Sequence, residues 1–540
     1  MDKHIQTIIK GGKEAAESLQ CFVEEASQVF EFPELNKNNQ RKELWEALFT
    51  LAKTANSEIT LMNCFIAIRI LSREKMGLNE LITDEWFKLM QKHSGLDDPQ
   101  YKFDASKLLL AIEVEKCLCN VIFNSPVAAG LCCKNGVLEQ LTERIKNPQE
   151  NKIPEEIRFY DVKLIFLLTA LCSEVRSKVK EELKGVESLL KMLDEMLKEA
   201  AQASPEKIIL DDQKVDLACE ILKALFNVTL SYGIYDDKEE NEQCDHLVTL
   251  LRMYLLVPTQ DKEKGLALKN NVINLLTNMP DSTFKNLITP VQPGQNLKPK
   301  FQFEGQNMTA FYEILMVLKS KFNNVEGVTK QYEILCPVVT ILLKSANSER
   351  AIRKYLRLQI LPPLKDVHSR PEQGSTLRNH LCRLLTTPIT QLRDLVADLL
   401  FILCKKSVKR MIKYTGYGNA AGLFAKRGLL GGRSDRGEAD YSSGSEGSET
   451  EEYAEFKHGI NPVIGCYEEP HPNAMENMTE EQKEYEAMKL VELMDSLTRS
   501  GTIQPCRVGE DGKPHPIKHV LQLQEGIKAQ QVNNDSDSDD

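Results

Sequence analysis

The stretch Ile221-Leu-Lys-Ala-Leu-Phe-Asn227-Val decides the predicted fold, because two other parts of the chain repeat its pattern. The related phrases are Val114-Glu-Lys-Cys-Leu-Cys-Asn120-Val and Val272-Ile-Asn-Leu-Leu-Thr-Asn278-Met. Each phrase opens on an apolar residue, places a Leu four positions later and an Asn two positions after that. Residues four apart share one face of a helix. Each phrase therefore predicts a helix that buries one stripe and shows a polar pair on another.

The polar pairs of these helices are Lys116 with Asn120, Lys223 with Asn227, and Asn274 with Asn278. The earlier stretch Ile66-Ala-Ile-Arg69-Ile-Leu-Ser-Arg73 fits the same frame with Arg at both positions. Repetition of one amphipathic unit is typical of an α-solenoid, and the spacing of about 40–50 residues, or simple multiples of it, matches armadillo or HEAT units. The predicted fold class is all-α: a right-handed armadillo/HEAT-like solenoid, followed by a partly disordered C-terminal tail that carries one extra helix.

Composition limits the class of protein. The chain has 540 residues, of which 42% are hydrophobic, and its net charge is −11. That charge argues against nucleic acid as the main partner. No apolar run reaches the roughly 18–20 residues of a membrane span, and the start Met1-Asp-Lys-His-Ile lacks a signal-peptide core. We expect a cytoplasmic protein without a transmembrane segment.

The sequence predicts no metal, cofactor or catalytic site. Most of the 14 cysteines lie in apolar helical patterns, as reduced buried thiols do. Cys117-Leu-Cys119 falls on a repeat helix and not on a loop with zinc-ligand spacing. The nine histidines are scattered, and no Ser or Cys has a recognisable nucleophile context. Gly416-Tyr-Gly418-Asn-Ala-Ala421 satisfies G-x-G-x-x-G/A, but residues 408–414 before it read as helix, whereas a dinucleotide fingerprint follows a strand. We interpret it as a turn.

The character of the chain changes after Ser407. We predict a helical-repeat domain over 1–425, a Gly-rich and acidic flexible linker over 426–478, a docking helix over 479–500 and a disordered acidic tail over 501–540. Thr479-Glu-Glu-Gln482 is a capping box that begins the docking helix. An isolated helix cannot bury its apolar stripe alone, so it must dock on the solenoid or on the partner. The side chains predicted to contact the partner are Tyr485, Met488, Val491 and Met494.

The acidic linker holds two candidate phosphorylation sites. Ser443 and Ser448 each have a Glu three residues later, which is a pattern that acidophilic kinases read. A phosphate adds roughly −2 of charge and would let the segment pair with basic residues of the solenoid.

The polar pairs are the candidate partner-binding residues. If the last helix of each repeat lines the inner groove, a ladder forms from Arg69, Arg73, Lys116, Asn120, Lys223, Asn227, Asn274 and Asn278. Asn can hydrogen-bond the backbone of a bound segment, and Arg can bind a carboxylate through two bonds. The alternative is that these residues are solvated or act as struts between repeats. Asn is a poor helix former, so its recurrence in mid-helix needs a reason.

Several stretches resemble the synembryn family, also called resistance to inhibitors of cholinesterase. They are Arg69-Ile-Leu-Ser-Arg73, Lys116-Cys-Leu-Cys-Asn120, Leu361-Pro-Pro-Leu-Lys-Asp366 with Arg370-Pro-Glu372, and Lys413-Tyr-Thr-Gly-Tyr-Gly-Asn-Ala-Ala-Gly422. The tail stretches Ile460-Asn-Pro-Val, Met478-Thr-Glu-Glu-Gln-Lys-Glu and Glu486-Ala-Met-Lys-Leu490 are similar to A-type members. The resemblance implies a guanine-nucleotide exchange factor and chaperone, without covalent chemistry, that binds G-protein α subunits without βγ. For the A-type it implies the inhibitory, q and 12/13 classes.

The resemblance also implies a site. In the family, the groove takes the C-terminal helix of the α subunit, and Arg69, Arg73 and Asn120 match groove positions. The family's phosphosites fall on Ser443 and Ser448, although Gly444 and Gly447 interrupt the usual acidic run. Recruitment to the plasma membrane or cell cortex would follow from binding the α subunit. Two other readings stay open: a passive armadillo-type peptide-binding adapter without exchange activity, and an enzyme that uses the Gly416 turn.

Overall fold

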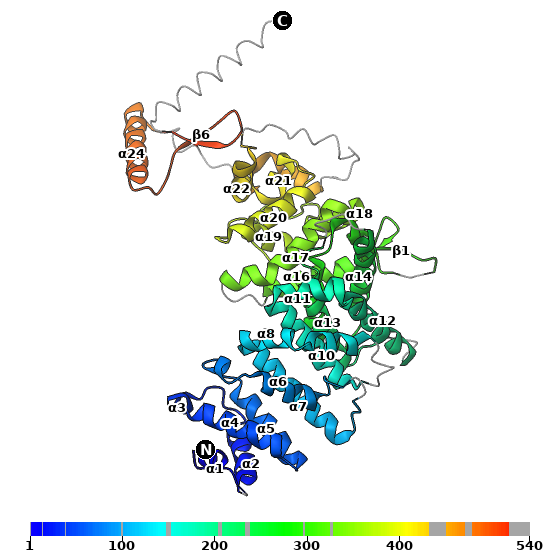
Figure 1. Ribbon diagram of the computed structural model, residues 1–540. Helices are drawn as coiled ribbons and strands as arrows, with labels where there is room; N and C mark the ends of the chain where they lie inside the picture. Colours follow the sequence, from blue (N-terminus) through cyan, green and yellow to red (C-terminus); the bar gives the residue numbers. More distant parts are fainter. Residues whose placement is uncertain are drawn as a thin grey trace. The chain divides into compact units, whose positions relative to one another are not determined.

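The structure is a computed structural model (Figure 1) that describes residues 2–12, 14–37, 39–98, 101–146, 153–203, 208–232, 238–294, 297–323, 328–430, 450–469 and 478–517. The chain divides into two compact units, Met1–Leu287 and Ile288–Asp540.

The regular elements among the described residues of the first unit are helices, apart from one isolated parallel bridge between Leu210 and Thr259. Its α-helices are α1 Asp2–Lys10, α2 Ala15–Ala26, α3 Pro33–Lys37, α4 Gln40–Thr54, α5 Glu58–Leu71, α6 Asp84–Ser94, α7 Ala105–Asn124, α8 Pro126–Lys134, α9 Val137–Lys146, α10 Glu155–Leu171, α11 Ser173–Ser177, α12 Gly185–Ala203, α13 Asp212–Val228, α14 Lys238–Leu256 and α15 Lys262–Leu276. Three further turns are the 3₁₀ helices η1 Leu78–Glu80 and η3 Asp281–Leu287 and the π-helix η2 Lys178–Glu182.

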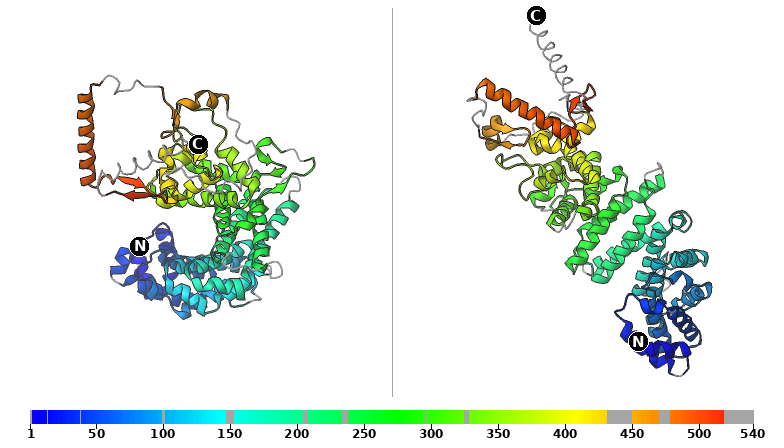
Figure 2. Two further views of the ribbon diagram at one scale, coloured as in Figure 1. Left: turned by 90° about the horizontal axis from the view of Figure 1, so that it is seen from above. Right: turned by 90° about the vertical axis from the view of Figure 1, so that its left-hand side faces the viewer.

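These helices form two layers. In one layer, α2, α5, α7, α10, α13 and α15 pack against one another in chain order. The other layer, which includes α4, α6, α9, α12 and α14, packs on the outside of that series, each helix against its successor in the chain. The stack from α5 to α13 can be followed in Figure 1 and from two further sides in Figure 2. The predicted all-α repeat fold is therefore confirmed in this unit.

Local sequence explains where these helices begin. A Ser, Thr or Asp at the N-cap uses its side-chain oxygen to accept a backbone N–H that has no partner within the helix. Thr83 accepts from the amide of Trp86 at 3.2 Å, Asp104 from Lys107 at 3.0 Å, and Asp211 from Lys214 at 2.9 Å. Apolar side chains at helical spacing then point to the core; in α7 these include Val114, Cys117, Leu118 and Val121, all fully buried.

The second unit begins with a small sheet and continues as helices. The helices are α16 Thr309–Asn323, α17 Val328–Ser348, α18 Arg350–Ile360, α19 Leu377–Leu384, α20 Thr390–Leu403, α21 Val408–Thr415, α22 Tyr417–Arg427, α23 Glu451–Phe456 and α24 Glu480–Arg499, with the 3₁₀ turns η4 Pro299–Phe301 and η6 Lys457–Gly459. The α16–α22 series packs around α17 and α20.

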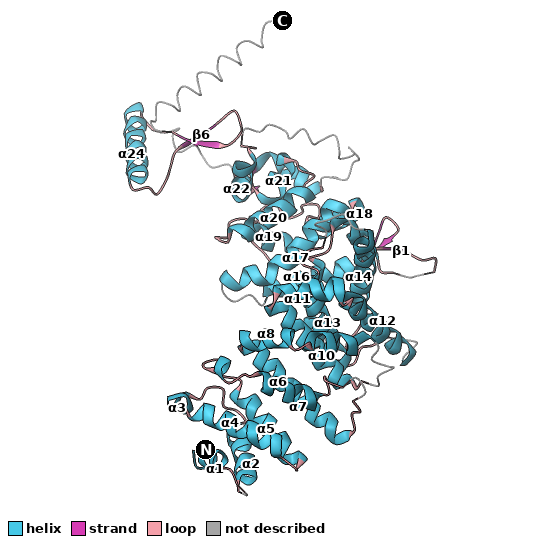
Figure 3. Cartoon of the chain, in the orientation of Figure 1, coloured by secondary structure: helices cyan, strands magenta, loops and turns pink. Residues whose placement is uncertain are grey.

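Short antiparallel strands accompany these helices (Figure 3). A three-stranded sheet has the order β1-β3-β2, from β1 Thr289–Pro290, β2 Gln302–Phe303 and β3 Gln306–Asn307. Two hairpins follow, β4 Ile460–Asn461 with β5 Cys466–Tyr467, and β6 Cys506–Val508 with β7 Pro514–Pro516.

The structure refines several expectations. Phe32-Pro-Glu-Leu-Asn-Lys-Asn-Asn-Gln predicts a loop from its sequence, but the stretch contains the helical turn α3, because Pro33 suits the first position of a helix. Leu361-Pro-Pro-Leu-Lys365 predicts a break between helices, since a helix seldom continues through proline, and α18 does end at Ile360. Within the predicted disordered tail 501–540, the β6–β7 hairpin forms, and residues 518–540 lie outside the described part. The predicted domain bounds stay a prediction.

Candidate partner-binding groove

Three of the predicted binding residues meet at one pocket of the first unit. Arg69 from α5 and Lys116 and Asn120 from α7 line a pocket of about 370 Å³. The other lining residues are Cys119 and Phe123 of α7 and Tyr160, Lys163 and Leu167 of α10. The pocket therefore spans three consecutive helices of the inner series, as expected of a groove along a solenoid.

A buried carboxylate sets the charge of this pocket. Glu113, whose side chain is 8% exposed, forms an ion pair with Arg69 and lies 3.6 Å from the ammonium of Lys116. Arg69, Lys116 and Lys163 thus bring three positive charges to the lining of the pocket, and Glu113 pairs with the first two of them. Burial raises the pKa of Tyr160 to about 12, so its hydroxyl stays protonated at neutral pH and can donate a hydrogen bond. The pocket suits an anionic group that accepts hydrogen bonds.

Arg73 points to a different place. Its guanidinium donates to the carbonyl oxygens of Ser27 at 2.8 Å and Val29 at 2.9 Å, and lies 4.9 Å from the ring centre of Phe30. Burial, followed by the positive charge of Arg69, lowers the pKa of Arg73. Arg73 is not among the residues that line the pocket, and it holds the segment after α2 against α5.

The recurring Asn residues bond to the neighbouring helix. Asn120 donates to the carbonyl of Arg69 at 3.3 Å. Asn227 donates to the carbonyl of Phe166 at 3.2 Å and to Thr169 Oγ1 at 3.1 Å. In the same way, Asn278, two residues past α15, donates to the carbonyl of Phe226 in α13. Each of these amides thus adds a hydrogen bond between successive helices, to a carbonyl near the end of the earlier one.

The remaining predicted ladder members lie outside the pocket. Lys223 pairs with Glu220 of its own helix at 2.7 Å, and its ammonium lies 5.3 Å from the ring centre of Phe166. Asn274 is exposed on α15. The structure thus joins Arg69, Lys116 and Asn120 and leaves these two residues farther along the series.

The predicted residues of the tail helix are exposed. Tyr485, Met488, Val491 and Met494 expose 62%, 70%, 56% and 41% of their surface. Thr479 and Gln482 form the predicted capping box, with both bonds present. An apolar stripe that is this exposed is a surface that a partner can cover. Ser443 and Ser448 lie outside the described residues.

The sequence analysis missed Tyr160, Lys163 and Phe123. A signal was present, because Tyr160, Lys163 and Leu167 follow the three- and four-residue spacing of one helix face. The apolar run after Lys163 hid this signal, since it reads as a fully buried helix. Phe123 follows Asn120 by three residues and is 65% exposed, which is unusual for a large aromatic side chain.

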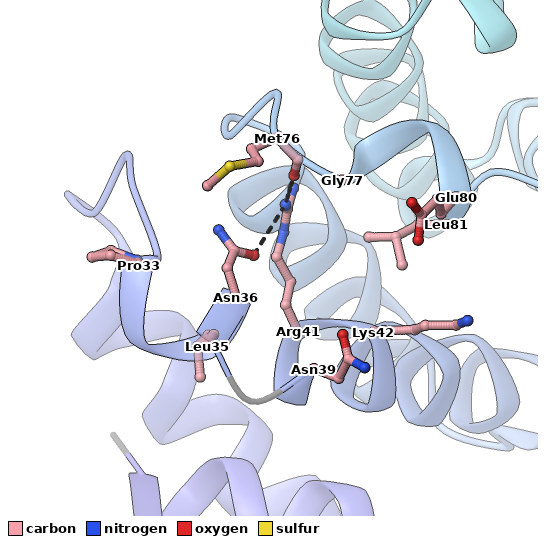
Figure 4. A pocket seen from close by; sticks show the side chains of 10 residues that line it. All are labelled: Pro33, Leu35, Asn36, Asn39, Arg41, Lys42, Met76, Gly77, Glu80 and Leu81. Carbon is pink, nitrogen blue, oxygen red and sulfur yellow. Dashed lines mark hydrogen bonds between the residues drawn. The ribbon is translucent and has the colours of Figure 1, made fainter.

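A second pocket, of about 430 Å³, lies between α3, the start of α4 and the α5–η1 loop (Figure 4). Arg41 is buried there and donates to the carbonyls of Leu71 at 2.8 Å and Glu74 at 2.6 Å; Figure 4 shows its bonds to Asn36 and Met76. These partners bind the two terminal nitrogens of the guanidinium, so Arg41 supports the end of α5.

The Gly416 turn has a structural role. It follows helix α21, and Gly416 has φ +73°, which a glycine adopts without strain. The amides of Tyr417 and Gly418, which begin α22, donate to the carbonyls of Pro462 at 2.8 Å and Val463 at 2.9 Å. In the dinucleotide fingerprint such amides would bind phosphate; here the chain itself occupies them.

The described ranges contain no group of three His, Cys, Asp or Glu side chains placed to hold a metal ion. None of their helices combines the length and apolar character needed to cross a membrane.

Comparison with known proteins adds to this geometry. The sequence matches the family described as "Guanine nucleotide exchange factor synembryn" (Ric8) over residues 64–513. It is 38% identical to the chaperone Ric-8A of Gallus gallus, over 96% of both chains, and 38% identical to Ric-8A of Danio rerio, over 99% of this chain and 98% of that one. It is 37% identical to the chaperone Ric-8 of Drosophila melanogaster, over 93% of both chains. A solved structure from a study of cadherin and beta-catenin covers 82% of this chain and 97% of its own, with a TM-score of 0.27 and 13% identity, too low to carry an argument. The family match and the nearly full-length relatives show that this chain belongs to the synembryn (Ric-8) family of guanine-nucleotide exchange factors and chaperones.

Proposed function

We propose that this protein releases GDP from monomeric G-protein α subunits, and assists their folding, by capturing the α subunit's C-terminal helix and stabilising the nucleotide-free state. The observation that carries the proposal is the pocket, where the positive charges of Arg69, Lys116 and Lys163 exceed the negative charge of Glu113. A helix that ends in a carboxylate matches such a pocket, because charge-assisted hydrogen bonds to a carboxylate are stronger than neutral ones. The exposed ring of Phe123 offers an apolar contact beside it.

The tail helix α24 supplies a second contact in this mechanism. Its exposed stripe binds the GTPase domain, while the groove binds the C-terminal helix of the α subunit and displaces it from its position on that domain. That movement loosens the loop that contacts guanine, and GDP leaves. No general acid, base or nucleophile is needed, because exchange follows from tighter binding of the empty state. Binding linkage then requires nucleotide to weaken the complex by the same factor, so GTP ejects the α subunit.

The finer features of the proposal rest on the family resemblance. We propose the inhibitory, q and 12/13 classes of α subunit as partners, bound without βγ. An acidophilic kinase would modify Ser443 and Ser448. The protein would work in the cytoplasm and reach the cell cortex through the α subunit.

Release of labelled GDP from several classes of purified α subunit, measured side by side, tests the proposal. We expect faster release with the wild-type chain, and at least about tenfold less stimulation with Lys163→Glu, because the reversed charge repels a carboxylate. Lys191→Glu, on the exposed face of α12, is the matched control and should stimulate as the wild type does.

Other outcomes separate the remaining readings. An α subunit that binds while its GDP release stays unchanged identifies an adapter. Saturable nucleotide binding by the isolated protein would support the reading in which Gly416 serves an enzyme. Cell-free synthesis of the α subunit, with and without this protein, tests the chaperone role by the yield of GTP-binding product.

A further inference from the structure

The tail helix is followed at once by a hairpin that is docked on another part of the second unit. We define the tail hairpin as residues 504–517, which contain β6 and β7. The amides of Thr502 and Ile503 both donate to the carbonyl of Leu497, at 3.0 and 3.2 Å, so the chain turns tightly out of α24. Only two residues separate Ile503 from β6 at Cys506. The end of α24 is therefore closely coupled to the hairpin.

The tail hairpin in turn rests on the end of α22. Helix α22 ends at Arg427, and its C-cap Gly428 has φ +70°. The amide of Leu430 donates to the carbonyl of Gly512 at 3.2 Å. A Cβ at Gly512 would overlap the carbonyl of Gly428, and a Cβ at Gly428 would overlap the carbonyl of Asp511. Two glycine backbones thus approach more closely than any other pair of residues would allow.

We infer that this glycine contact holds α24 in position. By fixing the tail hairpin to α22, Gly428 and Gly512 position the exposed stripe of α24 for binding the G-protein α subunit. The inference rests on the function proposed above. A helix that is already held in place on its own unit loses less freedom when it contacts the partner. The second contact then forms at a higher effective concentration than it would from a loose tail. Gly428 and Gly512 are positioning residues, since they touch the partner only through α24.

Gly512→Ala is the test, and Gly305→Ala is its matched control. Both glycines lie in hairpin turns of this unit with positive φ, +70° and +75°, but a Cβ at Gly305 meets nothing within 4 Å. In the full-length chain, Gly512→Ala should speed hydrogen exchange at the Leu430 amide and weaken binding of the intact α subunit by about tenfold. Gly305→Ala should do neither. A peptide of the α subunit's C-terminal helix, which needs only the groove, should bind all variants equally.

A double-mutant cycle separates positioning from general damage. In a chain that also carries Met488→Ser and Val491→Ser, Gly512→Ala should cause no further loss of affinity, because the stripe it positions is already removed. Gly428→Ala perturbs the same contact from its other side and should reproduce the result if Gly512→Ala folds poorly. Faster exchange at Leu430 with unchanged or tighter binding of the α subunit overturns the inference, as does exchange that stays slow in both variants. If the wild-type chain binds no α subunit, the proposed function fails instead.

Discussion

The side-chain amide of Asn278 lies 2.8 Å from the carbonyl oxygen of Phe226, and this hydrogen bond ties α15 to the end of α13. A second bond of 3.1 Å joins the same amide to Thr229 Oγ1. Asn227 makes the equivalent pair of bonds one helix earlier, to Phe166 and Thr169. The repeated Asn therefore joins successive helices of this series near their C-terminal ends. The expected mid-helix position is wrong for two of them, because Asn227 is the second-last residue of α13 and Asn278 lies two residues past the end of α15. A poor helix former is tolerated at such positions.

This role predicts a difference between two Asn residues of the same ladder. Asn227 is 8% exposed, and Asn227→Ala removes its two bonds to the preceding helix, one of them the buried bond to the hydroxyl of Thr169. We expect the free energy of unfolding to fall by about 1–3 kcal/mol. Urea unfolding followed by tryptophan fluorescence measures this, because Trp45 and Trp86, the chain's two tryptophans, are both buried in the first unit.

Asn274→Ala is the control for that measurement. Asn274 is exposed on α15, so its substitution should change the free energy of unfolding by less than about 0.5 kcal/mol. An equal fall in the free energy of unfolding of the two variants would show that the hydrogen bonds of Asn227 do not stabilise the packing of these helices.

A buried acid pair predicts how stability depends on pH. Arg144 bridges Glu115 at 3.0 Å and Asp161 at 2.9 Å, and both carboxyl side chains are 0% exposed. Burial, and then the charge of Asp161, raises the pKa of Glu115 well above its ordinary value. The stability that neutral Glu115 contributes is therefore complete below the pKa of an unfolded Glu, about 4.3, and is lost as the pH rises through the raised value in the folded state.

Gln at position 115 has no proton that can dissociate. The free energy of unfolding of Glu115→Gln should therefore decline less than that of the wild type between pH 5 and pH 8. The difference at pH 8 should reach about 1 kcal/mol or more in the same tryptophan assay. Glu143→Gln, at a surface carboxylate that is 65% exposed, should leave the wild-type pH profile in place. A profile for Glu115→Gln that follows the wild type would show that Glu115 is ionised in the folded protein.

Residues 450–469, the strap, pack against the start of α22. Alanine at Gly416 would have a strained φ and a Cβ 3.1 Å from the Ile464 and Val463 backbone. We expect Gly416→Ala to destabilise docking of the strap by about 1–2 kcal/mol and to speed tryptic cleavage after Lys457 about tenfold. Gly418→Ala has an ordinary φ and a single close neighbour, so its effect should be smaller. Equal cleavage rates in both variants and the wild type would contradict this role of Gly416.

The apolar stripe of α24 should matter for binding and not for stability. Met488 and Val491 are 70% and 56% exposed, so the pair Met488→Ser and Val491→Ser should change stability by less than about 0.5 kcal/mol per site. Stimulated GDP release should fall at least about tenfold, since truncated apolar anchors remove most of a contact's energy. Glu484→Ser in the same helix is the control. Full stimulation by the serine pair would exclude α24 from the contact.

The sequence by itself determined the local features of this protein. The helical spacing of apolar residues, the break at Leu361-Pro-Pro and the capping box from Thr479 to Gln482 are all present in the structure. Each depends on residues within a few positions of one another, and the chain's own geometry fixes those relations. The phrase ending in Asn227 likewise indicated the repeat, because each copy must bury the same face.

Only the tertiary structure decided which side chains meet. It brought Tyr160 and Lys163 to the pocket of Arg69 and turned Arg73 toward Ser27 and Val29. It also bound the turn at Gly416 to the strap through backbone hydrogen bonds. These contacts join residues that lie about 40–90 positions apart. They depend on how neighbouring helices are offset and rotated, and the helical period of one segment carries no information about its register against the next.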